Sequence, residues 1–321
     1  MFKSITSNPR RRLSGQAPLP GFQHSGDDLM QIQSLIQEVS RLFEAEKERL
    51  FYGHGTDNPW DEAVFLVLSV MDLPPDSDQS VAKLPVPANQ VQHIRELADR
   101  RIHTQMPLPY LLNLAYFKGL PFYVDERVLI PRSAFGELIF KRFSPWIPKP
   151  PQKILEIGTG SGCMAILAAL VFEEADIVAT DISKAALEVA QKNIEDYGLA
   201  HRIQLLESDL FQNIPPQTFD VIISNPPYVD EADMKTLPRE YQYEPKLALE
   251  SGKEGLNHTR EILKQAKAYL NPKGFIFIEV GNSQAALESA FPQTPFIWID
   301  FEEGECEIFV LAYEDIHDGR N

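Results

Sequence analysis

The segment Ser224-Asn225-Pro226-Pro227-Tyr228 carries the residues in this sequence whose types and spacing are best suited to chemistry. It follows the apolar run 219–223, which we interpret as a buried parallel strand. The segment therefore begins where a strand ends, at the carboxyl edge of a sheet. Two consecutive prolines restrict φ and keep the preceding residue extended, so the sequence predicts a stiff backbone corner that presents Asn225.

Such a corner suits the transfer of a group to a planar nitrogen, whose delocalised lone pair makes it a poor nucleophile. The side-chain oxygen of Asn225 and the carbonyl of Pro226 would accept its two N–H groups, and the Tyr228 ring would stack on the planar group. We predict Asn225, Pro226 and Tyr228 as catalytic residues. Together with Pro227 they form the predicted substrate-binding segment. The same residues are also typical of an ordinary Pro-Pro turn.

A glycine-rich loop predicts a cofactor site. Residues 156–162, Glu-Ile-Gly-Thr-Gly-Ser-Gly, follow a predicted strand and open a predicted helix. Glycines let a ligand approach the backbone closely. The spacing is Gly-x-Gly-x-Gly after an acidic residue, which differs from the Gly-x-Gly-x-x-Gly of dinucleotide-binding folds.

Acidic residues after the next two strands refine this prediction. Asp181 closes a strand, where a carboxylate accepts ribose hydroxyls, although it would also suit a helix N-cap. Asp209 is expected to face an adenine amino group and Leu210 to cover its ring. Neither acid has the basic neighbour of a phosphate site, so a nucleoside on a sulfonium, S-adenosylmethionine, fits best. The predicted cofactor-binding residues are Glu156, Ile157, Gly158, Thr159, Gly160, Gly162, Asp181, Asp209, Leu210 and Asn225.

Composition limits the classes of function. The 321 residues are 44% hydrophobic and 24% charged, which is ordinary for a soluble globular protein. No apolar run reaches the ~18 residues of a membrane helix, and we expect a cytoplasmic protein. The net charge of −16 disfavours a nucleic-acid partner and favours a basic protein substrate or a cationic cofactor. Cys163 and Cys306 lack metal-ligand spacing, so no metal site is expected.

Periodicity divides the chain into successive segments. A leader and a tail are expected to flank a small helical domain, a hairpin with a linker, and an α/β domain. The hairpin region contains three predicted short strands, at 116–117, 122–124 and 127–130. In the α/β domain, the last two strands are joined by only about five residues and cannot be parallel. The predicted segments are 1–27 (leader), 28–105 (helical domain), 106–150 (hairpin and linker), 151–314 (α/β domain) and 315–321 (tail).

These motifs together resemble the protein-(glutamine-N5) methyltransferases, over residues from about 28 to 313. The resemblance implies an α/β fold: a Rossmann-like class I methyltransferase domain with a seven-stranded sheet and one antiparallel strand. It also implies an N-terminal helical domain for substrate recognition, a linking β-hairpin and S-adenosylmethionine as cofactor. The residues that carry it are the loop 156–162, Asp181, the segment Asn225–Tyr228, the trailing Glu244-Pro245, Ala248-Leu249, Gly252 and Gly255-Leu256, and Leu129–Arg132.

The block 52–63, Tyr-Gly-His-Gly-Thr-Asp-Asn-Pro-Trp-Asp-Glu-Ala, resembles the branch of the family that modifies ribosomal protein L-3. The segments 122–129 and 131–133 do so too. This implies methylation of a glutamine amide in L-3, either free or during ribosome assembly. The branch that modifies release factors tends to have an acid where this chain has Gly136. We expect His54 to shape a turn or a contact surface.

Three alternatives stay open at this point. The first is methylation of a release factor at its Gly-Gly-Gln motif. The second is an adenine-amino methyltransferase acting on nucleic acid, because Asn-Pro-Pro-Tyr suits any planar nitrogen; it would require a basic cleft. The third is a non-catalytic module that binds an adenosyl cofactor and a ribosomal protein.

Overall fold

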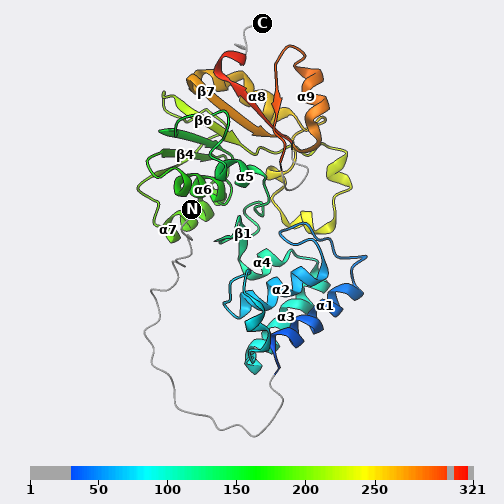
Figure 1. The fold of residues 1–321 in the computed structure, drawn as a ribbon. Helices are drawn as coiled ribbons and strands as arrows, with labels where there is room; N and C mark the ends of the chain where they lie inside the picture. The colour runs from blue at the N-terminus through cyan, green and yellow to red at the C-terminus, as the bar shows by residue number, and fades with distance from the viewer. Residues whose placement is uncertain (1–29, 302–306, 317–321) are drawn as a thin grey trace.

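The computed structural model describes residues 30–301 and 307–316 (Figure 1). The predicted leader 1–27, Cys306 and the end of the predicted tail, residues 317–321, lie outside the described residues. Within the described part, a helical unit lies beside a larger unit built on a β-sheet, and a small hairpin lies between the two (Figure 1).

The helical unit forms because apolar residues recur every three or four positions and share one core. Helix α1 buries Ile32, Leu35, Val39 and Phe43 on one face. Asn58 caps α2, where its Oδ1 accepts the N–H of Asp61 at 2.9 Å. The helices of this unit are α1 (Ile32–Ala45), α2 (Pro59–Val70), α3 (Ala88–Thr104) and α4 (Leu108–Leu112), with a 3₁₀ turn η2 (Gln79–Lys83).

The predicted hairpin is confirmed, and it consists of β1 (Ala115–Phe117) and β2 (Leu120–Phe122) in antiparallel register, although the second strand was predicted at 122–124. Its turn, Lys118-Gly119, has φ values of 49° and 79°, which match the twist of the two strands. The strand predicted over 127–130 is wrong. Backbone groups there bond side chains instead of a neighbouring strand: the Ile130 N–H donates to Glu244 Oε1 at 3.0 Å, and the Val128 carbonyl accepts the Tyr110 hydroxyl at 2.6 Å.

The larger unit contains the predicted seven-stranded sheet with one antiparallel strand. The strand order is β5-β4-β3-β6-β7-β9-β8, and only β9 runs against the others, since it is antiparallel to both β7 and β8. The chain moves outward from β3 to β5 and then returns to β6 on the other side of β3. The strands are β3 (Lys153–Ile157), β4 (Asp176–Asp181), β5 (Ile203–Glu207), β6 (Phe219–Ser224), β7 (Leu270–Glu279), β8 (Ile297–Trp298) and β9 (Ile308–Ala312).

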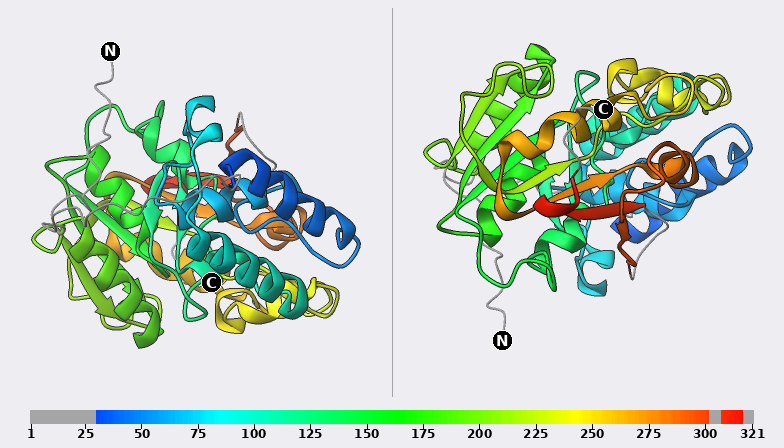
Figure 2. Two further views of the ribbon diagram at one scale, coloured as in Figure 1. Left: turned by 90° about the horizontal axis from the view of Figure 1, so that it is seen from below. Right: turned by 90° about the horizontal axis from the view of Figure 1, so that it is seen from above.

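Helices cover both faces of this sheet (Figure 2). Alternate residues of one strand therefore enter different cores: Ile154 belongs to the core under α6, and Leu155 belongs to the core under α8. This two-sided burial explains why the central strands are continuous apolar runs. The helices are α5 (Phe135–Phe140), α6 (Cys163–Val171) and α7 (Lys184–Asp196) on one face, and α8 (Asn257–Ala266) and α9 (Gln284–Ala290) on the other.

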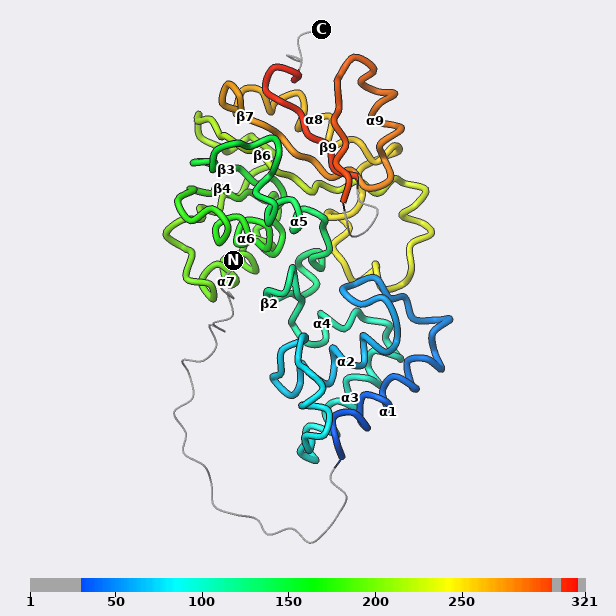
Figure 3. Tube along the Cα trace, viewed as in Figure 1, coloured from blue at the N-terminus to red at the C-terminus, as the bar shows by residue number. Residues whose placement is uncertain are grey.

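The long connection between β6 and α8, residues 225–256, leaves the sheet and passes beside the helical unit (Figure 3). We call it the connecting segment. It contains three 3₁₀ turns, η3 (Asp233–Lys235), η4 (Arg239–Tyr243) and η5 (Lys246–Ala248). Glu240, in η4, is buried against the helical unit.

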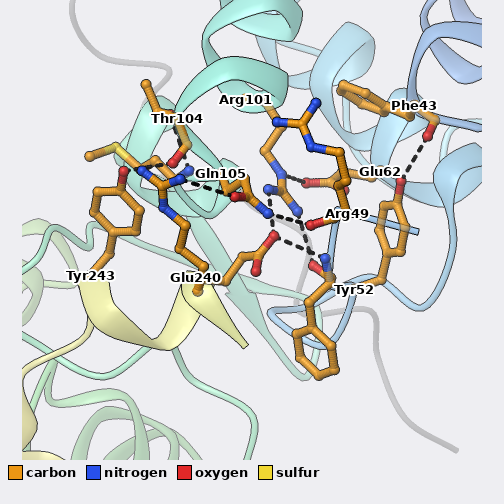
Figure 4. Close-up of polar contacts among 12 residues, drawn as sticks. Phe43, Arg49, Tyr52, Glu62, Arg101, Thr104, Gln105, Glu240 and Tyr243 are labelled. Atoms are coloured by element: carbon orange, nitrogen blue, oxygen red, sulfur yellow. Dashed lines mark hydrogen bonds and ion pairs between the residues drawn. The ribbon is translucent and has the colours of Figure 1, made fainter. Parts of the chain in front are cut away.

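A buried ion-pair network holds η4 in place (Figure 4). Arg101, in α3, donates to Glu62 of α2 at 2.7 Å, to Glu240 at 3.0 Å and to the carbonyl of Phe51 at 2.9 Å. The Phe51 N–H donates to Glu240 at 2.9 Å. Burial raises the pKa of the Glu62 carboxyl, and the positive charge of Arg101 opposes that rise. One guanidinium thus joins two helices to the connecting segment.

We predict that Arg101→Met lowers the free energy of unfolding by about 3–5 kcal/mol, because it leaves two carboxylates buried without their cation. The matched control is Arg95→Met on the same helix, whose guanidinium pairs with Glu38 at the exposed surface. The control should lose at most ~1 kcal/mol. Urea titration followed by circular dichroism measures both, and equal losses would show that the buried network adds nothing.

Candidate active site

The loop after β3 turns sharply because three of its residues adopt left-handed backbone conformations. Gly158, Gly160 and Gly162 have φ values of 77°, 54° and 80°, which glycine adopts without strain. A Cβ added to Gly160 would meet no atom within 4 Å, whereas one added to Gly162 would lie 3.3 Å from Cβ of Ala190 in α7. Gly160 therefore keeps space open beside the loop, and Gly162 permits close packing against α7.

Glu156 supports this loop from behind. Its carboxyl group is fully buried and accepts the Thr159 hydroxyl at 2.8 Å. Burial raises the pKa of Glu156 to about 8, and the Thr159 hydrogen bond opposes that rise. Neither side chain lines the pocket in front of the loop, and Gly162 does not line it either.

Asp181, at the end of β4, connects the glycine loop to the start of α7. One carboxylate oxygen accepts the N–H of Gly160 at 2.9 Å, and the other accepts the N–H of Ser183 at 2.8 Å. Ser183 itself is the N-cap of α7, since its hydroxyl oxygen accepts the N–H of Ala186. Burial raises the pKa of Asp181, and these backbone donors oppose the rise. A carboxylate has about four lone-pair sites, so Asp181 keeps acceptor capacity for a ligand.

The loop after β5 brings Asp209 and Leu210 to the same pocket. Leu210 has a positive φ of 49°, an unusual conformation for a bulky residue. Its carbonyl accepts the hydroxyl of Ser208 at 2.9 Å, which holds the turn. Asp209 is exposed, and its carboxylate accepts only the amide of nearby Gln212 among side-chain donors of the described residues.

The corner after β6 lies opposite the glycine loop. The Ser224 hydroxyl donates to the carbonyl of Ile157 at 2.9 Å and ties the end of β6 to the end of β3. Asn225, Pro226 and Pro227 line the pocket. In the part of the chain that the structure describes, the Asn225 side-chain amide makes no hydrogen bond, so both of its polar atoms are available.

Tyr228 lies outside this lining. Its hydroxyl lies 3.4 Å from Glu279 at the end of β7. Its ring packs so closely on Gly281 that a Cβ there would approach Cε2 to 2.5 Å. The structure therefore places Tyr228 beneath the corner, between the ends of β6 and β7.

One pocket collects these segments at the point where the strand order reverses between β3 and β6. Several residues of the pocket lining were not predicted from the sequence, because they come from loops outside the predicted motifs. Exposed apolar residues flank it, Ile182 at 49% and Leu247 at 53% exposed, which suits the faces of a flat ligand. The lining residues that were not predicted to bind cofactor or substrate are Arg127, Val128, Leu129, Ile182, Ser183, Ala186, Ser208, Ser224, Pro245, Leu247, Ala248 and His258.

The charges around the pocket favour a ligand without phosphate groups. Asp181 and Asp209 contribute carboxylates. The guanidinium of Arg127 is already paired with Asp125 at 2.7 Å and with Glu188 at 3.0 Å. Such a lining accepts hydroxyl and amino hydrogens and tolerates a positive charge.

The connecting segment closes one side of the pocket, and Glu244 anchors it there. Both Glu244 oxygens pair with Arg132, at 2.6 and 2.8 Å, and His54 Nε2 lies 3.5 Å from Oε2. Burial would raise the pKa of Glu244, but His54 and Arg132 lower it to about 2. The carboxylate is therefore ionised at neutral pH. The next residue, Pro245, lines the pocket.

Across residues 30–301 and 307–316, no three His, Cys, Asp or Glu side chains converge in a way that could hold a metal ion. None of the helices in these ranges combines the length and apolar character needed to cross a membrane.

Strands β3 to β6 and the corner lie within the range matched by a known family model. The model described as the methyltransferase small domain matches residues 140–240. Among solved structures, the hMettl16 catalytic domain in complex with MAT2A 3'UTR hairpin 6 has a TM-score of 0.50 at 15% identity, covering 74% of this chain and 87% of that chain. This likeness shows the fold alone.

Curated relatives match nearly the whole chain. The "ribosomal protein uL3 glutamine methyltransferase" of Francisella tularensis is 41% identical over 92% of this chain and 95% of its own length. The protein of the same name from Neisseria gonorrhoeae is 42% identical over 92% of this chain and 98% of its own length. Because the identity extends through both the helical and the sheet units, this chain belongs to the family of ribosomal protein uL3 glutamine methyltransferases.

Proposed function

We propose that this protein transfers a methyl group from S-adenosylmethionine to the side-chain amide nitrogen of a glutamine in ribosomal protein uL3 (L-3). The observation that carries the proposal is that Asn225 opens onto the same pocket as Gly158, Gly160 and Asp181, with a side-chain amide that has no hydrogen bond among the described residues. Membership of the family supports the reaction and the substrate.

The pocket residues fit S-adenosylmethionine. Asp181 would accept ribose hydroxyls, and Asp209 the adenine amino group, with Leu210 and Ile182 against the ring. Gly158 and Gly160 leave room for the ligand, since a Cβ at Gly160 would point into open space. When bound, the cofactor supplies an electrophilic methyl group on a sulfonium. Glu156, Thr159 and Gly162 would act by shaping the loop, because they lie outside the lining.

The corner would hold the glutamine amide. The side-chain oxygen of Asn225 and the carbonyl of Pro226 would accept its two N–H groups and so direct the nitrogen toward the methyl group. Positioning of this kind is worth up to ~7–11 kcal/mol of the barrier. No strong base is needed, because the extra proton of the product can leave to water. We assign Tyr228 a positioning role, since its ring packs beneath the corner on Gly281.

The partner should be a basic protein, because the chain carries a formal net charge of −16. Ribosomal proteins are made and assembled in the cytoplasm, and we place the reaction there. A nucleic-acid substrate is not favoured, since the carboxylates of Asp181 and Asp209 line the pocket and its Arg127 is already paired.

The direct test is methyl transfer by the purified full chain. Recombinant uL3, a release factor and an RNA hairpin are each incubated with radiolabelled S-adenosylmethionine, and the labelled peptide is located by mass spectrometry. We expect one methylated glutamine in uL3 and no label in the RNA. Label confined to the release factor or to the RNA would overturn the assignment.

We predict that Asn225→Ala lowers turnover on the order of a hundredfold or more while cofactor affinity stays nearly unchanged, because the lost hydrogen bond acts on the reacting nitrogen. Asn225→Asp keeps an acceptor oxygen of the same shape and should retain more activity. Steady-state kinetics and calorimetry with S-adenosylhomocysteine measure the two effects. Parallel losses of cofactor binding and turnover in Asn225→Ala would contradict this role.

We predict the opposite pattern for Asp181→Asn. Replacing a charged acceptor should weaken cofactor binding by roughly tenfold to a hundredfold, since hydrogen bonds to charged groups contribute ~1.5–3 kcal/mol. At saturating cofactor the turnover should recover. Asp196→Asn on the exposed face of α7 is the control and should leave both quantities unchanged. Undiminished calorimetric affinity in Asp181→Asn would remove Asp181 from the cofactor site.

A further inference from the structure

A second cavity, distinct from the pocket described above, lies between α2 and the hairpin. We call it the groove. One face of α2 forms a wall with Asp61, Val64, Phe65 and Leu68, and Tyr116 of β1 lies opposite. The rings of Phe65 and Tyr116 meet edge to face with centroids 5.9 Å apart. Apolar side chains of α2 and β1 therefore line the groove, together with a carboxylate on α2.

The groove adjoins the pocket through two stretches of chain. Residues 127–129 line the pocket, and the next two residues, Ile130 and Pro131, line the groove. On the other side, His54 lines the groove and lies 3.5 Å from Glu244, whose neighbour Pro245 lines the pocket. A peptide lying in the groove would thus be next to the site where Asn225 binds an amide.

The charges of the groove define what it can bind. Its lining contains Asp57 and Asp61 and no lysine or arginine. The Asp61 carboxylate accepts the side-chain amide of Asn58 at 2.7 Å. Asp57 is exposed and has no hydrogen-bond or ion-pair partner among the described residues. The groove therefore offers two carboxylates with no cation in its lining, of which Asp57 also has no hydrogen-bond donor, beside apolar walls, which suits the long stem and charged end of lysine or arginine.

His54 gives an independent indication of a ligand. It is only 5% exposed, yet among the described residues its Nδ1 has no hydrogen-bond partner and its Nε2 has only the Glu244 carboxylate, at 3.5 Å. Buried polar atoms nearly always have a partner, so an unpaired Nδ1 on a residue that lines the groove calls for an explanation. The ring is held by Tyr241 and Phe51, with centroids 4.8 and 5.9 Å away. An imidazole nitrogen is thus held in place to bond the backbone of a docked chain.

We propose that the groove docks the stretch of the substrate protein that flanks the target glutamine, with a lysine or arginine of that stretch at Asp57 and its backbone at His54. This inference rests on the proposed function, because it assumes a protein substrate, and it adds where and by which chemistry that protein is recognised. The groove is a binding surface, and Asn225 remains the site of reaction.

The test compares two charge reversals of equal net effect. Asp57→Lys changes the groove, and Asp76→Lys changes an exposed position outside its lining. Each changes the net charge from −16 to −14, so long-range attraction of a basic substrate is altered equally. With recombinant uL3 as probe, Asp57→Lys should raise KM about five- to tenfold at unchanged kcat and cofactor affinity, and Asp76→Lys should stay within about twofold of wild type.

Variants of His54 test the second contact. His54→Phe keeps the ring packing and removes both nitrogens, so KM for uL3 should rise. His54→Gln restores a hydrogen-bonding group and should recover part of the affinity. Thermal unfolding is measured alongside, because a purely structural role would change Tm in proportion to KM and would show no rescue by glutamine. If a His54 variant fails to fold, the comparison of KM between Asp57→Lys and Asp76→Lys is sufficient to test the proposal.

Equal KM values for Asp57→Lys and Asp76→Lys would overturn the proposal that the groove docks the substrate, while leaving the proposed function intact. If wild type does not methylate uL3, the proposed function fails, and the affinity for uL3 without cofactor then tests the groove: a loss confined to Asp57→Lys supports it, and no loss overturns it. Two other occupants would also overturn the proposal. They are a second copy, seen as a dimer that Asp57→Lys dissociates, and an RNA whose binding Asp57→Lys strengthens.

Discussion

The arrangement of this protein depends on two buried carboxylates of the connecting segment. Glu240 pairs with Arg101 of the helical unit, and Glu244 pairs with Arg132 next to the hairpin. A buried charge is stable only when its partner and hydrogen bonds are present, so each pair permits a single placement of the backbone. The segment between β6 and α8 is thereby fixed against both units. It begins at the corner that presents Asn225 and leads into the first turn of α8, and both contribute residues to the pocket lining.

This fixed segment explains how distant parts of the chain form one site. The glycine loop and the corner meet because β3 and β6 are neighbours, with Ser224 bonded to the carbonyl of Ile157. Further walls come from the ends of β4 and β5, from the connecting segment and from residues 127–129, whose neighbour Ile130 is held by a side-chain bond without regular structure. A planar amide and a sulfonium ligand can then be held with little further reorganisation, which is the condition for catalysis by positioning.

Several features could be predicted from the sequence because they depend on local chemistry. Apolar runs that alternate along the chain with helical segments predict the strands of the sheet. The short link before the last strand predicts that this strand is antiparallel. The roles around the site were harder to predict. Glu156 and Thr159 lie outside the pocket lining, and Tyr228 packs on Gly281, because side-chain direction at a strand end depends on the neighbouring strand. The strand predicted over 127–130 failed because Glu244 bonds its backbone.

Sequence alone determined the class of this protein: the glycine loop, Asp181 and the Asn-Pro-Pro-Tyr corner require left-handed glycines, a strand-end acid and fixed proline φ values, all of which are local. Tertiary structure alone decided which side chains share a cavity. It brought Ile182, Leu247 and His258 to the pocket and left Nδ1 of the buried His54 without a hydrogen-bond partner among the described residues. The physical reason is that burial and ion pairing are set by residues far apart in the chain, whose proximity no local pattern records.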